Sequence, residues 1–141
     1  MPRFVRSVLV LLALLPCLAG CEKISRVSEC RKLAATVSRA MDAIEVAGKA
    51  NSAAGYRAAA KRYQELAREV RQARFKTSVT QGAIEEYALA LESVAPPVIT
   101  YAEALEKGNA RGQAEARREI ERVGRREHAA SSRVDALCRA P

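Results

Sequence analysis

Apolar residues recur at every third or fourth position through four long stretches of this chain, a spacing typical of amphipathic helices. The stripes cover residues 24–44, 56–73, 84–105 and 116–137. The composition agrees with helix and disfavours sheet, because the chain is rich in Ala and Arg, has no Trp and has only seven Gly. The sequence therefore predicts an all-α fold.

Short breaks separate the four stripes, near residues 48–51, 75–78 and 108–109. Asn51 or Ser52 is expected to cap the second helix and Asn109 the fourth, while Ser78 and Gln81 have capping-box spacing before the third. Long helices joined by short connections are typical of an antiparallel up-down-up-down four-helix bundle. We expect this architecture here.

A proline pair, Pro96-Pro97, falls inside the third stripe. Proline removes a helix hydrogen bond and restricts the residue before it, yet the apolar phase runs through the pair without a shift. We expect either one helix kinked at Pro96-Pro97 or two short helices stacked end to end.

The N-terminus carries Arg3 and Arg6, continues with an apolar run at 7–15, and reaches Leu18-Ala19-Gly20-Cys21. This order is typical of a secretory signal peptide, and the last four residues resemble a bacterial lipobox. The resemblance implies a bacterial lipoprotein that signal peptidase II cleaves before Cys21, whose sulfur carries a diacylglycerol with acyl chains such as palmitate. The alternative is an ordinary signal peptide with a chance cysteine.

The lipobox sets the expected domain boundaries: signal peptide at 1–20, lipid anchor and short tether at 21–24, and helical bundle at 25–141. Glu22 is not the aspartate that commonly retains enteric lipoproteins in the inner membrane. The resemblance therefore favours the outer membrane over the inner, with the bundle facing the periplasm. Only Glu22 and Lys23, with Ile24 at most, separate Cys21 from the first helix, so this end of the bundle is expected close to the bilayer.

Two cysteines remain in the bundle, Cys30 near the start of the first helix and Cys138 near the end of the fourth. In an up-down-up-down bundle those two ends lie together, and an exported protein is exposed to an oxidising compartment. We predict a Cys30–Cys138 disulfide. The alternative is a pair of separate buried thiols.

Enzyme chemistry and metal binding find little support in the sequence. His128 is the only histidine, and the pairs Glu85-Glu86 and Glu119-x-Glu121 point in diverging directions on a helix. No nucleophile triad, phosphate-binding loop, haem attachment motif or carboxylate-histidine metal motif is present. We expect a non-enzymatic protein without a cofactor.

Four tyrosines lie on the inward stripes of the second and third helices: Tyr56, Tyr63, Tyr87 and Tyr101. One interpretation is core packing with the hydroxyls at the rim. The other is an aromatic groove between these helices that binds a peptide or a small ligand.

Charge is divided among the helices, since residues 57–76 and 109–140 are basic and residues 78–107 are acidic. An acidic third helix between two basic ones would help to select the neighbours. Four arginines of the fourth helix leave an excess on one face: Arg118, Arg122, Arg125 and Arg126. They are either a solvated face or a site for an envelope polyanion such as anionic lipid, and nucleic acid is not expected as a partner.

The N-terminal segment and the helical remainder together resemble small helical envelope lipoproteins of high-GC Gram-negative bacteria. This resemblance transfers no functional residues beyond Cys21. It favours a membrane-anchored interaction or scaffold protein with an envelope protein as its partner. A ligand binder that uses the tyrosines and a polyanion binder that uses the arginines are the alternatives.

Overall fold

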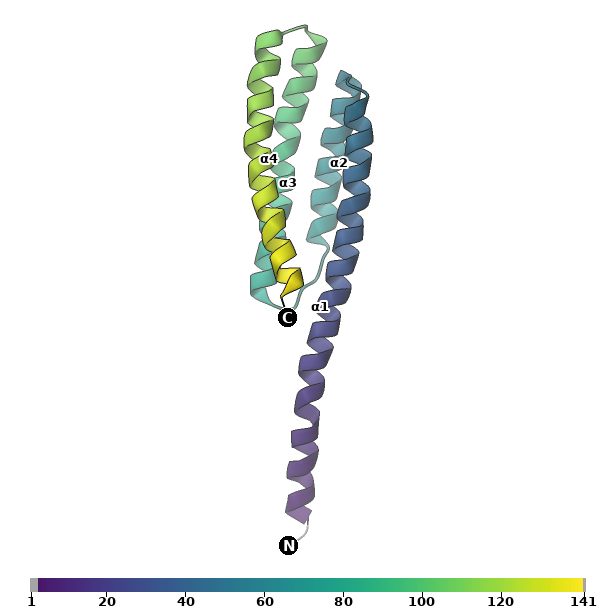
Figure 1. Cartoon of the computed structure of the whole chain (residues 1–141), viewed down its shortest axis with the longest axis vertical. Coiled ribbons are helices and arrows are strands. Elements are labelled where there is room, and N and C mark those ends of the chain that lie inside the picture. The colour runs from purple at the N-terminus through teal and green to yellow at the C-terminus, as the bar shows by residue number, and fades with distance from the viewer. Residues whose placement is uncertain (1–2, 141) are drawn as a thin grey trace.

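The computed structural model describes the backbone of residues 3–140 and the side chains of residues 24–140. It contains four helices, α1 (Arg3–Lys49), α2 (Ala53–Arg71), α3 (Ser78–Glu106) and α4 (Ala110–Arg139), and no strand within the described residues (Figure 1). The all-α prediction is therefore confirmed.

The helices form a bundle in which sequence neighbours run antiparallel and pack side by side (Figure 1). α2 packs against α3, α3 against α4, and α1 along α2. In contrast, α1 and α4 touch at few positions. The predicted bundle is confirmed, but the seam between its first and last helices is largely open.

Two of the expected helix caps are present. Ser52 precedes α2, and its hydroxyl oxygen accepts a 3.1 Å hydrogen bond from the backbone N–H of Gly55. Asn109 precedes α4 and accepts in the same way from Gly112 at 3.0 Å. Gly108 ends α3 with a φ of +61°, a left-handed conformation that glycine adopts without a steric penalty. These bonds satisfy helix-end groups that would otherwise lack partners.

The cap of α3 differs from the Ser78–Gln81 capping box expected from the sequence. Thr77 is the N-cap, and its hydroxyl oxygen accepts a 3.3 Å hydrogen bond from the N–H of Thr80. The Gln81 side chain instead accepts from the backbone N–H of Phe75 at 3.2 Å, which secures the loop before the helix. Thr77 and Ser78 are both residue types that favour the N-cap position. In the structure Thr77 occupies it, and the Gln81 side chain bonds to the loop instead of to the cap.

The proline pair lies inside a single helix, so the expectation of two stacked helices is wrong. Pro97 is buried while Pro96 is exposed, and the hydroxyl of Thr100 donates to the carbonyl oxygen of Pro96 at 3.2 Å. Because Pro97 contributes to the apolar face of α3, burial of that face is continuous across the pair.

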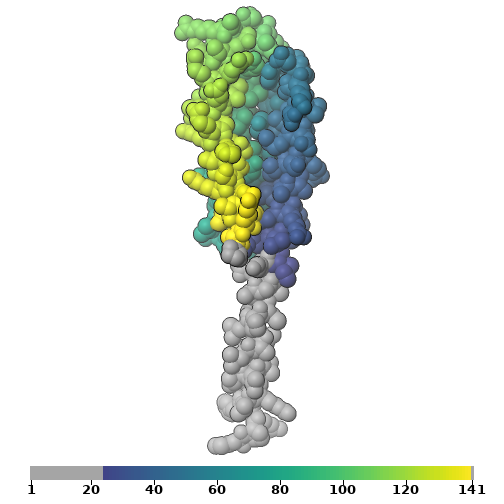
Figure 2. Space-filling model, in the orientation of Figure 1, coloured from purple at the N-terminus to yellow at the C-terminus, as the bar shows by residue number. Residues whose placement is uncertain are grey.

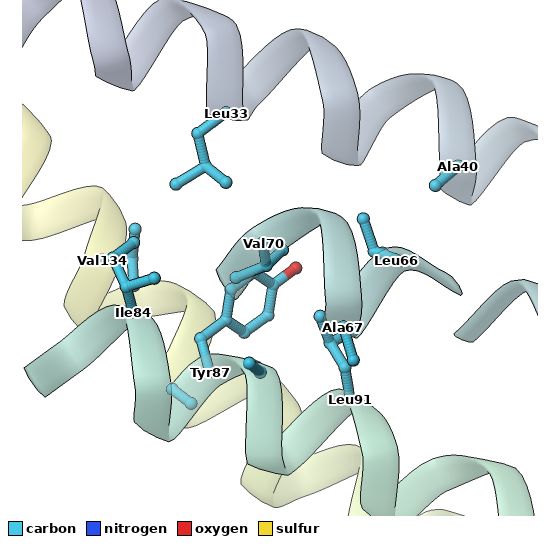
Figure 3. Close-up of a cluster of buried hydrophobic side chains, with 11 residues drawn as sticks. Leu33, Ala40, Leu66, Ala67, Val70, Ile84, Tyr87, Leu91 and Val134 are labelled. Carbon is cyan, nitrogen blue, oxygen red and sulfur yellow. The ribbon is translucent and has the colours of Figure 1, made fainter. Parts of the chain in front are cut away.

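The core near the disulfide end is built from all four helices (Figure 3). α1 contributes Leu33 and Ala40, and Tyr87 projects from α3 into the middle of the cluster. The largest fully buried side chains of the described residues lie here: Leu66, Ile84, Leu91 and Val70.

Ile44 of α1 is also buried in the opposite half, but the clustered core there is built from α2, α3 and α4 and has smaller side chains. It consists of Ala60, Val94, Ala95, Val98 and Val123. In this half α1 lies against α2, where Ala47 approaches Gly55 so closely that an added Cβ would be 2.4 Å from its carbonyl oxygen.

Ion pairs between helices agree with the predicted division of charge. They join basic α2 to acidic α3 and basic α4 to acidic α3, as Arg57–Glu106, Arg71–Glu85, Arg71–Glu92 and Arg133–Glu86. Exposed ion pairs stabilise a fold by about 0–1 kcal/mol each, so their main effect here is on which helices are neighbours.

The predictions for residues 1–23, including the lipobox and the lipidation of Cys21, concern side chains outside those that the structure describes. Within the part of the chain that the structure describes, no helix is both long enough and apolar enough to cross a bilayer.

Candidate functional site

A disulfide closes one end of the bundle. Cys30 of α1 and Cys138 of α4 are bonded, with their Cα atoms 5.8 Å apart, as predicted. At the same end, the guanidinium of Arg26 donates a 2.6 Å hydrogen bond to the carbonyl oxygen of Ala140. These two links join α1 to the C-terminal end of α4.

Beyond the disulfide, the first wall of the open seam is one face of α1. Val37 and Met41 follow Cys30 by seven and eleven residues, so the three side chains share a face of the helix. Because Cys30 is bonded to α4, this face is directed towards α4. Val37 is half-buried and Met41 is 36% exposed, although both belong to the apolar stripe.

The second wall is the face of α4 that carries Cys138. Glu127 and Gly124 lie eleven and fourteen residues before that cysteine, on the same side of the helix. A Cβ added to Gly124 would have no atom within 4 Å, so it faces open space. In Figure 2, teal atoms of the inner helices are visible between α4 and α1, at the bottom of this shallow groove.

Glu127 forms an electrostatic cluster with two tyrosines beside the seam. Tyr87 is buried, and Tyr63 and Glu127 are half-buried. Burial raises the pKa of the Glu127 carboxyl, against smaller lowering effects of nearby His128 and of a hydrogen bond with Tyr87. Burial and then the charge of Glu127 raise the pKa of both Tyr63 and Tyr87. Tyrosine hydroxyls held in their neutral form beside a desolvated carboxyl can donate hydrogen bonds but do not form a nucleophile.

The other two tyrosines form a separate pair in the far half of the bundle. The rings of Tyr56 and Tyr101 meet edge to face with centroids 4.9 Å apart. Arg117 lies 5.5 Å from the Tyr101 ring centroid and donates to its hydroxyl oxygen at 3.0 Å. The Tyr56 hydroxyl donates to the side chain of Asn51 at 3.0 Å. Both hydroxyls therefore have partners within the chain, as structural tyrosines usually do.

The arginine-rich face of α4 is exposed and lies away from the seam. Arg122 pairs with Glu119 within the helix. Among the described residues, Arg118, Arg125 and Arg126 form no ion pair. The structure thus brings together four basic side chains on one face, of which three form no ion pair among the described residues.

The structure also places the histidine and the glutamates that were considered above for metal binding and catalysis. In the described part of the chain, no group of three or more His, Cys, Asp or Glu side chains is placed to hold a metal ion. His128 is exposed, Glu85 pairs with Arg71 and Glu86 with Arg133. Both carboxylates are therefore engaged in ion pairs between helices.

Sequence reasoning missed Glu127, although its position carried a signal. Val123 and Ala130 flank it at four and three residues, so the carboxyl lies in line with an apolar stripe. A charged residue at such a position is either close to a polar partner or beside an opening in the core. Here both conditions hold.

The chain matches no protein-family model, no curated protein and no solved structure.

Proposed function

We propose that this protein is a non-enzymatic lipoprotein of the bacterial cell envelope, anchored through Cys21, and that it holds a partner protein in the seam between α1 and α4. Two features support the anchoring: the Leu18-Ala19-Gly20-Cys21 motif and a Cys30–Cys138 disulfide suited to an oxidising compartment. The outer membrane is favoured by Glu22.

The observation that carries the binding proposal is the open seam. A four-helix bundle normally buries all four helix seams, but here α1 and α4 meet at few positions. At this opening the apolar side chain of Met41 is 36% exposed and the carboxyl of Glu127 is half-buried. An amphipathic segment of a partner in this groove would cover the apolar wall and supply a hydrogen-bond donor to Glu127.

Photocrosslinking in intact membranes tests this proposal, and two glycines offer a matched pair of positions. Gly124 lies in the seam and Gly82 on the exposed face of α3, and a side chain added at either meets no atom within 4 Å. A photoreactive amino acid at Gly124 should give a discrete protein adduct, and the same residue at Gly82 should not.

The Cys21→Ser variant provides the test of the anchor. It should take up no labelled fatty acid, while wild-type protein should be labelled and remain with the membrane fraction. A labelled wild type that gives identical adducts at Gly124 and Gly82 would retain the anchor and reject the seam. An unlabelled wild type would reject the lipoprotein itself.

The arginine face of α4 supports a second candidate function, binding of an envelope polyanion. The specific observation is that Arg118, Arg125 and Arg126 are exposed and form no ion pair among the described residues. Retention on an immobilised polyanion should then fall when these three become Gln, and should be unchanged when Lys107 and Arg111 do. Equal retention of the two variants would reject this candidate.

A further inference from the structure

Apolar side chains remain exposed on α1 at the disulfide end of the bundle. Ile24 is 72% exposed and Val27 is 38% exposed, although both belong to the apolar stripe of the first helix. With Ser28 and Arg31 they follow the spacing of one helix face, and together with Lys32 they line a shallow hollow. Within the residues that the structure describes, no other helix covers this face of α1.

The two ends of the bundle differ in charge. Residues 24–32, 68–86 and 133–140 gather at the disulfide end and contain nine basic and five acidic side chains. Residues 42–57 and 100–115 form the opposite end and contain four basic and five acidic ones. The disulfide end is therefore a basic surface and the far end is not.

Some of the basic side chains at the disulfide end are paired with acidic ones, and the others leave this end with unpaired positive charge. Lys32 pairs with Glu29, and Arg139 with Asp135. Arg31 and Lys76 are exposed and form no ion pair among the described residues. Lys76 belongs to the α2–α3 loop, which the chain brings to the same end as Arg31. Unpaired basic side chains beside exposed apolar ones are typical of surfaces that lie on anionic membranes.

We propose that the disulfide end of the bundle docks on an anionic phospholipid surface, with Ile24 and Val27 in the headgroup region and Arg31 and Lys76 beside the phosphates. The inference rests on the proposed lipid anchor, which would hold the disulfide end of the bundle close to the membrane. Ile24 follows Cys21 by three residues, and that length of chain reaches about 10 Å at most. It adds that the bundle does not swing freely on the anchor. The α1–α4 seam then stands upright and faces the periplasm.

The chain contains no Trp, so the tryptophan fluorescence of a variant with one introduced Trp comes from that position alone. Val27→Trp places the reporter on the proposed lipid face. Val46→Trp is the matched control, because Val46 is 70% exposed on the same helix and lies about 28 Å along it. Both variants are prepared as the full lipidated protein in vesicles that contain phosphatidylglycerol and brominated lipid.

The docked state predicts strong bromine quenching and a blue-shifted emission for Val27→Trp, and neither for Val46→Trp. Replacing Arg31 and Lys76 by Gln should lower the equilibrium constant for docking about fivefold for each charge removed. Replacing Lys107 and Arg111 at the far end should leave the quenching unchanged. Pure phosphatidylcholine vesicles should abolish most of the difference between the two reporters.

Three results would overturn the inference: no quenching of Val27→Trp, equal quenching of both reporters, or equal quenching in anionic and phosphatidylcholine vesicles. Its failure is separable from that of the proposed function, because mass spectrometry of the N-terminal peptide first establishes whether Cys21 carries lipid. A lipidated protein without quenching at residue 27 retains the anchor and rejects the docked face.

Discussion

The two halves of this bundle are built differently. The half at the disulfide buries Leu66, Ile84 and Leu91 between four helices, and a covalent bond joins α1 to α4. The far half buries mainly alanine and valine between three helices, and α1 there lies only against α2. A bundle can thus be closed at one end and open along a seam at the other.

This contrast shows where a small bundle obtains its stability and where it leaves surface available for binding. Large side chains and a cross-link concentrate stability in one half, because buried apolar area favours the native state and a cross-link lowers the conformational entropy of the unfolded chain. The other half then needs no contact between α1 and α4. The exposed Met41 and the half-buried Glu127 lie beside the stretch of seam where that contact is missing.

Removal of the disulfide should have the largest effect. The Cys30→Ser/Cys138→Ser variant should lose about 4–5 kcal/mol by the chain-entropy model, because the bond closes a loop across a separation of 108 residues. Denaturant unfolding under non-reducing conditions measures this loss. A change below about 1 kcal/mol would mean that packing alone holds α1 in place.

Truncation of one buried valine to alanine in each half compares the packing of the two cores. Val70 is fully buried in the four-helix half and Val123 is 2% exposed in the three-helix half. Val70→Ala should cost about 2 kcal/mol and Val123→Ala about 1 kcal/mol, because the open half can relax into the space left behind. Equal losses in urea unfolding would show that the halves are equally rigid.

Two glycine substitutions should change the free energy of unfolding in opposite directions. Gly124→Ala should raise the free energy of unfolding by about 0.5–1 kcal/mol, since the new methyl group meets open space and alanine favours helix. Gly55→Ala should lower it, because its Cβ would be 2.4 Å from the Ala47 carbonyl oxygen. Destabilisation by Gly124→Ala would mean that the seam is filled.

The smallest expected effect is a pH dependence at Glu127. Burial raises the pKa of this carboxyl in the folded protein above the ordinary value of about 4.3, so the native state binds the proton more tightly than the unfolded chain. Its contribution to stability is therefore lost as pH rises from that value through the raised pKa. Glu127→Gln should be more stable than wild type at pH 7, and the advantage should vanish in acid. An advantage that grows in acid would contradict the assigned direction.

Much of the fold could be predicted because it depends on local pattern. Helix periodicity, the caps at Ser52 and Asn109, and the Cys30–Cys138 pairing all follow from residue type and spacing along the chain. The cap of α3 could not be predicted, since Thr77 and Ser78 are chemically equivalent caps and a loop bond from Gln81 accompanies the observed choice.

The candidate site was less predictable, because it depends on which stripe residues are left uncovered. Ile24, Val27 and Met41 have the spacing of core residues, yet they are exposed. Their exposure follows from the small area over which α1 meets α4 and from the extension of α1 past the bundle end, neither of which is a local property of the sequence.

Hydrogen exchange of the purified, partner-free protein tests whether the far part of α1 is held less firmly than the rest of the bundle. Amides at 41–48 of α1 are compared with amides at 94–104 of α3, which lie in the same half, and with those at 30–38 of α1 near the disulfide. We predict that residues 41–48 lose protection first, with an opening free energy well below that of both other segments. Equal protection of 41–48 and 94–104 would contradict the open seam.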